Sequence, residues 1–303
     1  MATGGAGVSE LASRPLDTAA VRQRRPTSAS EEGVAGGSGR VAVVTGAARG
    51  IGAATVLALA EAGWSVLAVD LATDDPALPY AMGTESDLAG VVAEANRPAV
   101  APHRVCPFVA DVREQSAMDA AVAEAERRWG GLDAAIACAG VIAGGVPLWE
   151  VPLAQQQAVL DIDLGGVLSL ARAAIPSLLR RAEPRSGRFL AVASAAATRG
   201  LPMLAAYCAA KAGVAGLIRA LGSELGGTGV TANAVSPGST ATPILDESAR
   251  LYDLPGAGTF AAQQPLHRLL DPAEVAAVLA FLAGPASSGM TGAVVPVDGG
   301  LAL

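Results

Sequence analysis

Short runs of apolar residues alternate along the chain with longer stretches in which apolar residues recur at helical spacing. The apolar runs cover residues 41–45, 64–69, 103–109, 132–138, 188–193, 230–235 and 293–297. Runs of this length are typical of strands buried on both faces of a sheet. Their alternation with helical stretches predicts a single α/β domain, in which a doubly wound parallel sheet of about seven strands carries helices on both faces.

The first 39 residues differ in composition from the rest of the chain. They are rich in glycine, alanine, serine, proline and arginine and show no apolar periodicity, which predicts a disordered leader over 1–39 and one folded domain over 40–303. In the whole chain, 51% hydrophobic residues and 36 glycines fit a buried parallel sheet. The sequence contains neither the apolar core of a signal peptide nor an apolar span long enough to cross a membrane.

Charge and cysteine content exclude several classes of function. The net charge is −7 and no basic stripe gathers in the domain, which argues against a nucleic-acid partner. Cys106, Cys138 and Cys208 are an odd number without metal-ligand spacing, so we expect no metal site and a reducing, cytoplasmic location. His103 and His267 stand apart from any cluster of ligands.

The first strand leads into a glycine turn that is typical of dinucleotide-binding proteins. The segment Gly46-Ala47-Ala48-Arg49-Gly50-Ile51-Gly52 precedes a helical stretch over 53–62. Glycines permit the tight turn and let a pyrophosphate approach the backbone, where the start of the helix offers unpaired N–H groups. The Gly-x-x-x-Gly-x-Gly spacing differs from the Gly-x-Gly-x-x-Gly of two-domain dehydrogenases and indicates another branch of these proteins.

Asp70 ends the second strand, about 20 residues beyond the glycine turn. A carboxylate at that place accepts hydrogen bonds from the adenosine ribose and repels a 2′-phosphate, which predicts NAD rather than NADP. Arg49 in the glycine turn is the residue that could argue for NADP, and it could instead lie along the phosphates or the helix start. A solvated aspartate at a strand end is the alternative reading of Asp70.

The only lysine of the chain, Lys211, follows Tyr207 by four residues, although 21 residues are basic. On a helix this spacing places the phenol and the ammonium on one face. A neighbouring cation lowers the pKa of a phenol, so Tyr207 is a candidate acid/base group. By itself the spacing is also compatible with an accidental surface pair.

With these features in place, the chain resembles the short-chain dehydrogenase/reductase family from about residue 40 to its end, which implies a Rossmann-type fold. Ser194 lies 13 residues before Tyr207, the family's serine-to-tyrosine separation, and Pro237-Gly238-Ser239-Thr240-Ala241-Thr242 resembles the family's segment beside the nicotinamide. The resemblance implies that Tyr207 exchanges a proton with the substrate oxygen, that Ser194 hydrogen-bonds this oxygen, and that Lys211 lowers the tyrosine pKa and holds the nicotinamide ribose. Removal of a hydride from a carbinol carbon requires such a proton acceptor.

The same resemblance implies a set of contacts with NAD. Besides Tyr207 and Lys211, these are Gly46, Arg49, Gly50, Ile51, Gly52, Asp70, Leu71, Asp111, Val112, Ala139, Gly140, Pro237, Gly238, Thr240 and Thr242. Of these, Asp111 falls where the family contacts adenine. Family members are commonly homotetramers, and we expect a homo-oligomer here.

Two positions depart from the family pattern. The family's Asn-Asn-Ala-Gly is Ala137-Cys138-Ala139-Gly140 here, so two amide side chains are lost and packing is expected to compensate. The family's helix asparagine, which positions a water in the proton relay, falls on Asp163. An aspartate could accept a hydrogen bond from that water, or donate one if burial keeps it protonated. We therefore assign Asp163 to the catalytic set.

An insertion over 71–84 follows Asp70, and Thr84-Glu85-Ser86-Asp87 reads as a capping box that opens a helix over 85–95. The insertion resembles that of the mycofactocin-coupled, carveol dehydrogenase-like subgroup, which is described as holding NAD without ready exchange. The resemblance implies a tightly bound NAD that an external redox carrier such as mycofactocin reoxidises. A surface loop without effect on exchange is the alternative.

A long connection between the sixth strand and the helix that opens at Asp271 contains Ile244, Leu245, Leu251, Tyr252, Leu254 and Phe260. An apolar loop at the nicotinamide end predicts a substrate lid, or a subunit contact, and favours a small hydrophobic secondary alcohol or ketone as substrate. Three other functions remain: a conventional NAD-exchanging alcohol dehydrogenase, a non-catalytic NAD-binding regulator, which has no need of Ser194, Tyr207 and Lys211, and an epimerase or dehydratase. Epimerases and dehydratases usually have a larger C-terminal substrate domain.

Overall fold

The computed structural model describes residues 39–97 and 104–303. The leader expected over residues 1–39 lies outside the described residues except for Gly39, and so does His103, the expected start of the third strand.

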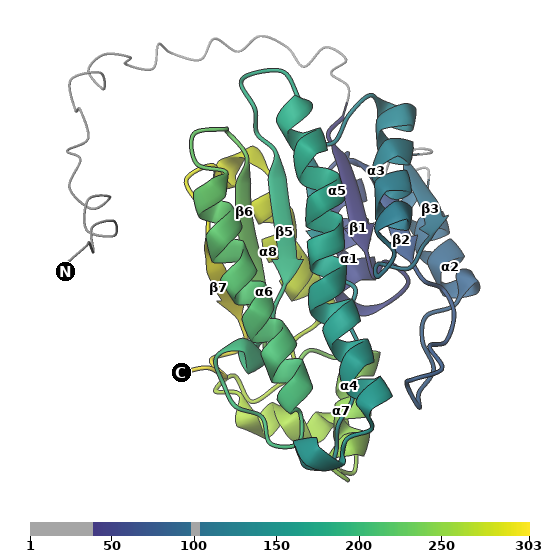
Figure 1. Cartoon of the computed structure of the whole chain (residues 1–303), viewed down its shortest axis with the longest axis vertical. Helices are drawn as coiled ribbons and strands as arrows, with labels where there is room; N and C mark the ends of the chain where they lie inside the picture. The colour runs from purple at the N-terminus through teal and green to yellow at the C-terminus, as the bar shows by residue number, and fades with distance from the viewer. Residues whose placement is uncertain (1–38, 98–103) are drawn as a thin grey trace, which may run out of the picture. The chain divides into compact units, whose positions relative to one another are not determined.

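Seven parallel strands form one sheet in the order β3-β2-β1-β4-β5-β6-β7 (Figure 1). The strands are β1 Val41–Thr45, β2 Ser65–Asp70, β3 Val105–Val109, β4 Ala134–Ala137, β5 Arg188–Val192, β6 Thr231–Pro237 and β7 Val294–Val297. Every predicted strand exists, and their ends move by one or two residues from the predicted bounds. The fold class predicted from the apolar runs is confirmed.

Residues 39–97 and 104–303 contain eight α-helices, most of which cover the two faces of the sheet. They are α1 Gly50–Glu61, α2 Glu85–Ala95, α3 Gln115–Trp129, α4 Leu153–Leu160, α5 Gly166–Arg180, α6 Ala205–Glu224, α7 Pro243–Leu251 and α8 Pro272–Ala283. Helices α3, α5 and α6 lie in front of the sheet in Figure 1, while α1, α2 and α8 lie behind it. Capping boxes open α2 at Thr84 and α8 at Asp271, so both predicted helix starts are confirmed.

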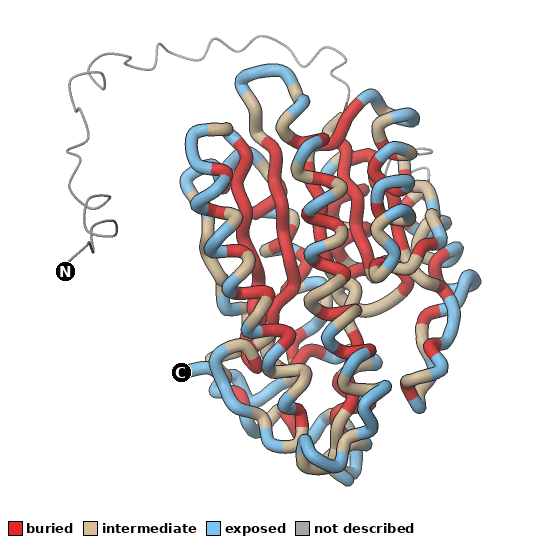
Figure 2. The backbone as a smooth tube through the Cα atoms, in the orientation of Figure 1, coloured by how far each residue is buried: buried red, intermediate tan, exposed pale blue. Residues whose placement is uncertain are grey.

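The sheet separates two apolar cores. On one side Met118, Leu170 and Ile218 pack against alternate residues of the strands, and on the other side Val56 and Leu279 do so. All residues of β1 and β5 are buried, which Figure 2 shows as continuous red segments in the centre of the fold. Burial on both faces explains why these strands read as unbroken apolar runs.

The order in which strands are added to the sheet reverses between β1 and β4. β2 and β3 lie on one side of β1, whereas β4 and the later strands lie on the other side. The helix after β1 covers one face, whereas the helices that follow β4 cover the other, so the loops at the carboxyl ends of these two neighbours diverge. Ligands of open α/β sheets bind in the crevice at such a switch point. The topology therefore places the site at the carboxyl ends of β1 and β4.

Candidate active site

A cavity of about 630 Å3 opens at the carboxyl ends of the strands. It is lined by all but one of the residues that the sequence assigned to catalysis or to NAD. These are Gly46, Arg49, Gly50, Ile51, Gly52, Asp70, Leu71, Asp111, Val112, Ala139, Gly140, Ser194, Tyr207, Lys211, Pro237, Gly238, Thr240 and Thr242. The exception is Asp163, which is fully buried behind the wall of the cavity.

The glycine turn leaves the backbone open to a ligand. Gly46 has a φ of +67°, and a Cβ atom on it would lie 2.6 Å from the Ala139 nitrogen. A Cβ atom on Gly52 would overlap the carbonyl oxygen of Gly46. Side chains are therefore excluded at both positions, and the N-terminus of α1 faces the cavity with unpaired N–H groups that suit a pyrophosphate.

The Asp70 carboxylate is held at the end of β2 by two backbone donors. Its oxygens accept hydrogen bonds from the Ala48 N–H at 2.9 Å and from the Ala72 N–H at 3.0 Å, which ties the glycine turn to the start of the insertion. The guanidinium of Arg49 donates to the Ala81 carbonyl of the insertion at 2.9 Å. Arg49 is thus engaged by the chain itself, and Asp70 is the charged group fixed at this end of the cavity.

The loop after β4 compensates for its missing asparagines through the backbone. The Thr45 hydroxyl oxygen accepts from the N–H groups of Cys138 and Ala139 at 3.2 and 3.3 Å. A Cβ atom on Gly140 would lie 3.3 Å from Nζ of Lys211, which is a tight contact and shows how closely this loop passes the lysine. Thr45, which the sequence did not single out, thus positions one wall of the cavity.

Tyr207 and Lys211 lie one turn apart on α6, as their spacing predicted. Nζ of Lys211 lies 5.6 Å from the centroid of the Tyr207 ring and donates to the Val192 carbonyl at 3.2 Å. Ser194 follows β5, and its hydroxyl accepts from the Ala196 N–H at 3.1 Å, which fixes the side chain at the cavity wall. Lys211 is buried, whereas Ser194 and Tyr207 are partly open to the cavity.

Asp163 stands behind Lys211. It belongs to a π-helical turn, Asp161–Gly165, between α4 and α5. Its Oδ1 accepts from the Val141 N–H at 2.7 Å, and its Oδ2 lies 3.1 Å from Nζ of Lys211. Single π-turns inside helices often mark functional sites because they shift the register of the side chains. Here the turn brings a carboxylate to the lysine.

The charged groups act on one another's pKa values. Burial raises the pKa of the Tyr207 phenol above its ordinary value, the Lys211 ammonium and the Ser194 hydroxyl lower it, and the Asp163 carboxylate raises it. The net shift of the Tyr207 pKa is upward. Lys211 does lower this pKa, as the sequence predicted, but the predicted net lowering is wrong because the other contributions are larger. Burial lowers the pKa of Lys211, but Asp163 and Tyr207 raise it by more than burial lowers it. The net direction is upward, so the ammonium keeps its proton.

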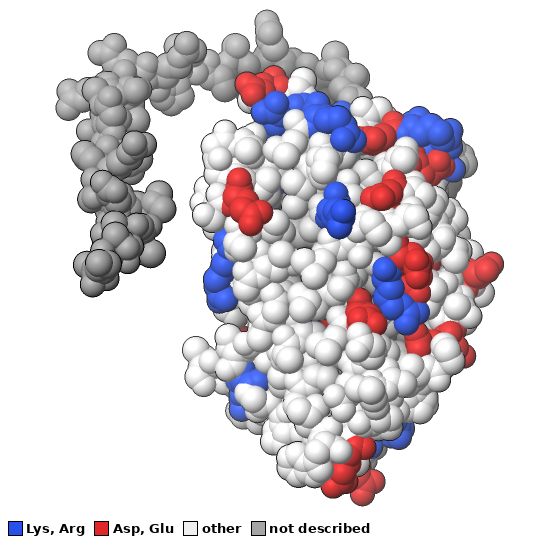
Figure 3. Space-filling view, in the orientation of Figure 1, with Lys and Arg blue, Asp and Glu red and all other residues white. Residues whose placement is uncertain are grey.

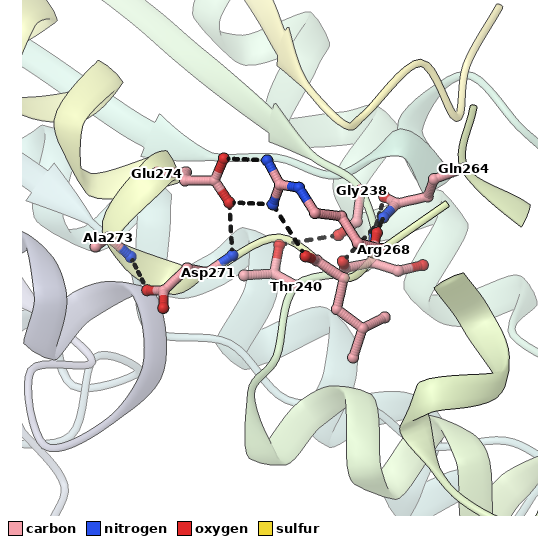
Figure 4. A network of polar contacts seen from close by, with 9 residues as sticks. Gly238, Thr240, Gln264, Arg268, Asp271, Ala273 and Glu274 are labelled. Atoms are coloured by element: carbon pink, nitrogen blue, oxygen red, sulfur yellow. Dashed lines mark hydrogen bonds and ion pairs between the residues drawn. The ribbon is translucent and has the colours of Figure 1, made fainter. Parts of the chain in front are cut away.

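Gln264 holds the segment 237–242 after β6, which resembles the family's segment beside the nicotinamide. Its side chain is buried, with 1% of the residue exposed. Its Oε1 accepts from the Ser239 N–H at 2.8 Å, and its amide nitrogen donates to the carbonyls of Ser239 and Arg268 (Figure 4). Arg268 forms a two-pronged ion pair with Glu274 at the start of α8. No local pattern predicts that Gln264 supports the cavity, because its partner Ser239 lies 25 residues upstream.

The insertion over 71–84 folds against the cavity and packs onto the core. Leu78 is buried, and the Tyr80 hydroxyl accepts from the Ile142 N–H at 3.0 Å in the loop after β4. Asp75 is buried and pairs with Arg113 at 2.7 Å, and Arg113 also pairs with Asp111 of the cavity wall at 2.6 Å. The insertion is thus fixed at both the adenosine side and the side of Gly140.

The apolar connection after β6 also covers the cavity, but it is mostly helical. Pro243–Leu251 forms α7, and Ala257–Gln263 forms a 3-10 helix, so the connection predicted as a long loop contains two helical segments. Leu245 and Phe260 are buried against each other. The Tyr252 hydroxyl donates to the Pro202 carbonyl at 2.7 Å, which joins this cover to the loop that follows Ser194.

Cysteines, possible metal sites and possible membrane spans can be described only for residues 39–97 and 104–303. All three cysteines are free, and burial raises the pKa of the Cys138 thiol to about 12, so it stays protonated at neutral pH. Among residues 39–97 and 104–303 no group of histidines, cysteines and carboxylates could hold a metal ion. In the same part of the chain, no helix combines the length and the apolar character that a membrane span requires.

Fold and site together define a dinucleotide-dependent oxidoreductase that acts on CH–OH groups. A family model described as enoyl-(acyl carrier protein) reductase matches residues 46–302. The chain belongs to the short-chain dehydrogenase/reductase family.

Several characterised relatives and solved structures are similar to the chain over almost their whole length. A cis-4-hydroxycyclohexanecarboxylate dehydrogenase from Sinomonas cyclohexanicum is 38% identical over 86% of this chain and 96% of its own. A (−)-trans-carveol dehydrogenase from Rhodococcus erythropolis is 32% identical over 88% and 98%. The crystal structure of carveol dehydrogenase from Mycobacterium avium in complex with NAD superposes with a TM-score of 0.81, at 31% identity, over 87% of this chain and 98% of that one.

Proposed function

We propose that the protein oxidises a hydrophobic, cyclic secondary alcohol to the ketone, or reduces the ketone, with NAD as the hydride carrier. The observation that supports this most directly is the opening of Ser194 and Tyr207 into an apolar end of the cavity. That end is lined by Ile142, Leu204, Ile244, Leu245, Leu254 and Phe260. Relatives that act on carveol and on hydroxycyclohexanecarboxylate support a ring-bearing substrate.

The residues around the cavity fit NAD. The glycine turn admits a pyrophosphate, and the fixed Asp70 carboxylate suits a ribose with a free 2′-hydroxyl and repels a 2′-phosphate. When bound, NAD accepts the hydride from the carbinol carbon. The M. avium carveol dehydrogenase in the comparison contains NAD, which supports the same cofactor for this chain.

The chain's own side chains would handle the proton. As the carbinol carbon loses its hydride, its oxygen must lose a proton, and the Tyr207 hydroxyl oxygen is the acceptor. The Ser194 hydroxyl donates a hydrogen bond to the substrate oxygen and fixes its orientation. The Lys211 ammonium stabilises the phenolate form of Tyr207 by charge, since it lies 5.6 Å from the ring. Reduction of the ketone runs through the same groups in reverse.

We further propose that NAD stays bound through many turnovers and is reoxidised in place by an external redox carrier such as mycofactocin. The support is the insertion, which is anchored through Asp75, Tyr80 and the carbonyl of Ala81 and lines the cavity with Met82 and Gly83. Release of the cofactor would require these contacts to open. An ordinary exchanging dehydrogenase would not need an anchored cover at this place.

The test is made in two steps on the purified protein. Mass spectrometry of the denatured protein should find co-purified NAD, and single-turnover addition of trans-carveol or cis-4-hydroxycyclohexanecarboxylate should reduce that NAD, as seen by NADH absorbance. Absence of reduction by any cyclic secondary alcohol would exclude the proposed reaction and favour a non-catalytic NAD-binding role. Exchange of isotopically labelled NAD within a few turnovers would exclude retention and leave a conventional NAD-dependent alcohol dehydrogenase.

A further inference from the structure

A buried ion pair stands directly behind the proton-transfer group. Asp163 is 0% exposed and Lys211 is 4% exposed, and their charged atoms lie 3.1 Å apart. The Asp163 carboxylate has one backbone donor on its other oxygen, the Val141 N–H at 2.7 Å. The pair therefore lies within the protein, and Asp163 contacts Lys211 without lining the cavity.

We propose that Asp163 is a positioning residue that holds the Lys211 ammonium and offsets its charge, so that Tyr207 accepts its proton at higher pH than it would with an amide at position 163. This inference replaces the water-positioning role expected from the family's asparagine. A carboxylate in direct contact with the lysine carries a full negative charge toward the phenol, whereas an amide at the same place would carry none. The kinetic consequence rests on the proposed alcohol oxidation, but the charge effect does not.

The ionised form of the pair follows from its surroundings. Burial raises the pKa of the Asp163 carboxyl above its ordinary value, and the Lys211 ammonium and the Val141 N–H offset part of this rise. If Asp163 took up a proton, the Lys211 ammonium would remain buried with only the Val192 carbonyl as its partner. An unpaired buried charge is costlier than a paired one, so at neutral pH the carboxylate and the ammonium persist together.

The other polar groups around Tyr207 and the ion pair do not carry a compensating charge. Ser194 after β5 and Cys208 on α6 are uncharged neighbours of the phenol, and Cys138 after β4 is a protonated thiol near Lys211. Tyr80 of the insertion faces Asp163, and burial raises the pKa of its phenol, so it is neutral. Among the described residues, Lys211 and Asp163 are thus the charged groups that face Tyr207. Removal of the charge of either group therefore shifts the Tyr207 pKa in a known direction.

The experiment compares Asp163→Asn with the unchanged protein in two measurements. The first is the pH dependence of kcat/KM for a cyclic secondary alcohol, whose acid limb reports Tyr207 ionisation. The second is direct titration of the phenolate by ultraviolet absorbance, with Tyr207→Phe subtracted to isolate this one of three tyrosines. In the Asn variant both curves should move to lower pH, and the rate constant at a pH below both limbs should rise by roughly tenfold.

The matched control is Asp161→Asn. Asp161 lies in the same π-turn, and its side chain hydrogen-bonds only Gln157 at 2.7 Å, so both curves should stay in place in this variant. Asp163→Ser is neutral, can still accept from the Val141 N–H and carries the test if the Asn variant does not fold. Unmoved curves in a folded neutral variant, or a move to higher pH, would overturn the inference. The absorbance titration needs no substrate, so it decides the matter even if no cyclic alcohol is oxidised.

Discussion

At the scale of single residues, the chemistry depends on where charge is fixed around two uncharged hydroxyl groups. Ser194 and Tyr207 face the cavity, while Lys211 sits behind the phenol and is itself held by Asp163 and the Val192 carbonyl. Burial of this group keeps water from screening the charges, so each of them acts strongly on the tyrosine. The cofactor end depends on one fixed carboxylate, Asp70.

We predict that Tyr207→Phe loses hydride transfer by a factor of at least about 100 while NAD binding is largely kept, because only the phenolic oxygen is removed from the proton path. Single-turnover reduction of bound NAD by a cyclic secondary alcohol measures the loss. Thr228→Val is the control, since Thr228 does not line the cavity and its hydroxyl bonds only the Leu225 carbonyl and the Val230 N–H, so the rate should stay within a few-fold. Undiminished transfer in Tyr207→Phe would remove the tyrosine from the mechanism.

We predict that Asp70→Ala narrows the preference for NAD over NADP, because the repulsion of a 2′-phosphate is removed. Calorimetric titration of the protein, stripped of bound cofactor, with each dinucleotide gives the two dissociation constants. The ratio of the constant for NADP to that for NAD should fall by roughly tenfold or more. The variant also loses two acceptors for the Ala48 and Ala72 N–H groups, so weaker binding of NAD itself is expected. Equal affinities of the unchanged protein for both dinucleotides would contradict the role assigned to Asp70.

At the scale of elements, two segments outside the regular sheet shape the cavity. Residues of the insertion over 71–84 and of α7 with the 3-10 helix after it line the cavity. Each is tied to the framework by a few polar contacts, of which the Arg113 pairs and the Tyr80 hydroxyl are the main ones for the insertion.

We predict that Arg113→Gln speeds exchange of labelled NAD by roughly tenfold or more. The change leaves the Asp75 carboxylate buried without its cation, which weakens the closed insertion, and each 1.4 kcal/mol lost from the barrier to opening is about tenfold in rate. Arg97→Gln is the matched control, because Arg97 is exposed and only approaches Glu94 at 3.9 Å. Deletion of residues 74–83 should increase exchange further, and an unchanged exchange rate in both altered proteins would show that the insertion does not retain NAD.

At the scale of the whole molecule, the sheet carries an apolar core on each of its two faces (Figures 1 and 2). The surface is not uniform. Figure 3 shows acidic and basic groups scattered over one face, with large uncharged areas between them. Several large apolar side chains of the α4 and α5 region are exposed, with Trp149 at 84% and Leu153 at 76%. Exposed apolar side chains of this size make the region a candidate protein contact surface.

We predict that the protein is a homotetramer, as the family resemblance implies. Sedimentation equilibrium at micromolar concentration should give four times the chain mass. Leu168→Glu, which places a charge on an exposed leucine of α5, should lower this mass, since a buried unpaired charge at an interface is costly. A monomer in the unchanged protein would exclude the tetramer, and a tetramer that the substitution leaves intact would exclude α5 from the contact.

The sequence by itself determined the features that local patterns encode. Seven strands follow from apolar runs, the starts of α2 and α8 from capping boxes, and the cofactor turn from the spacing of its glycines. Tyr207 and Lys211 were found because one helical turn always places such a pair on one face. The helix α7 could also have been found, since Pro243 at its first turn and the apolar pair Leu245 and Ala249 are helix signals.

Only the tertiary structure decided which distant groups meet. The Asp163 carboxylate reaches Lys211 through a π-turn, the Tyr80 hydroxyl reaches Ile142 over 62 positions, and Gln264 supports Ser239 over 25. The sign of the Tyr207 pKa shift belongs here too, because burial and the charge of Asp163 outweigh the lysine. Contacts of this kind depend on how elements pack rather than on spacing along the chain, so the sequence fixes the candidates for the site while the packed fold sets their charges and partners.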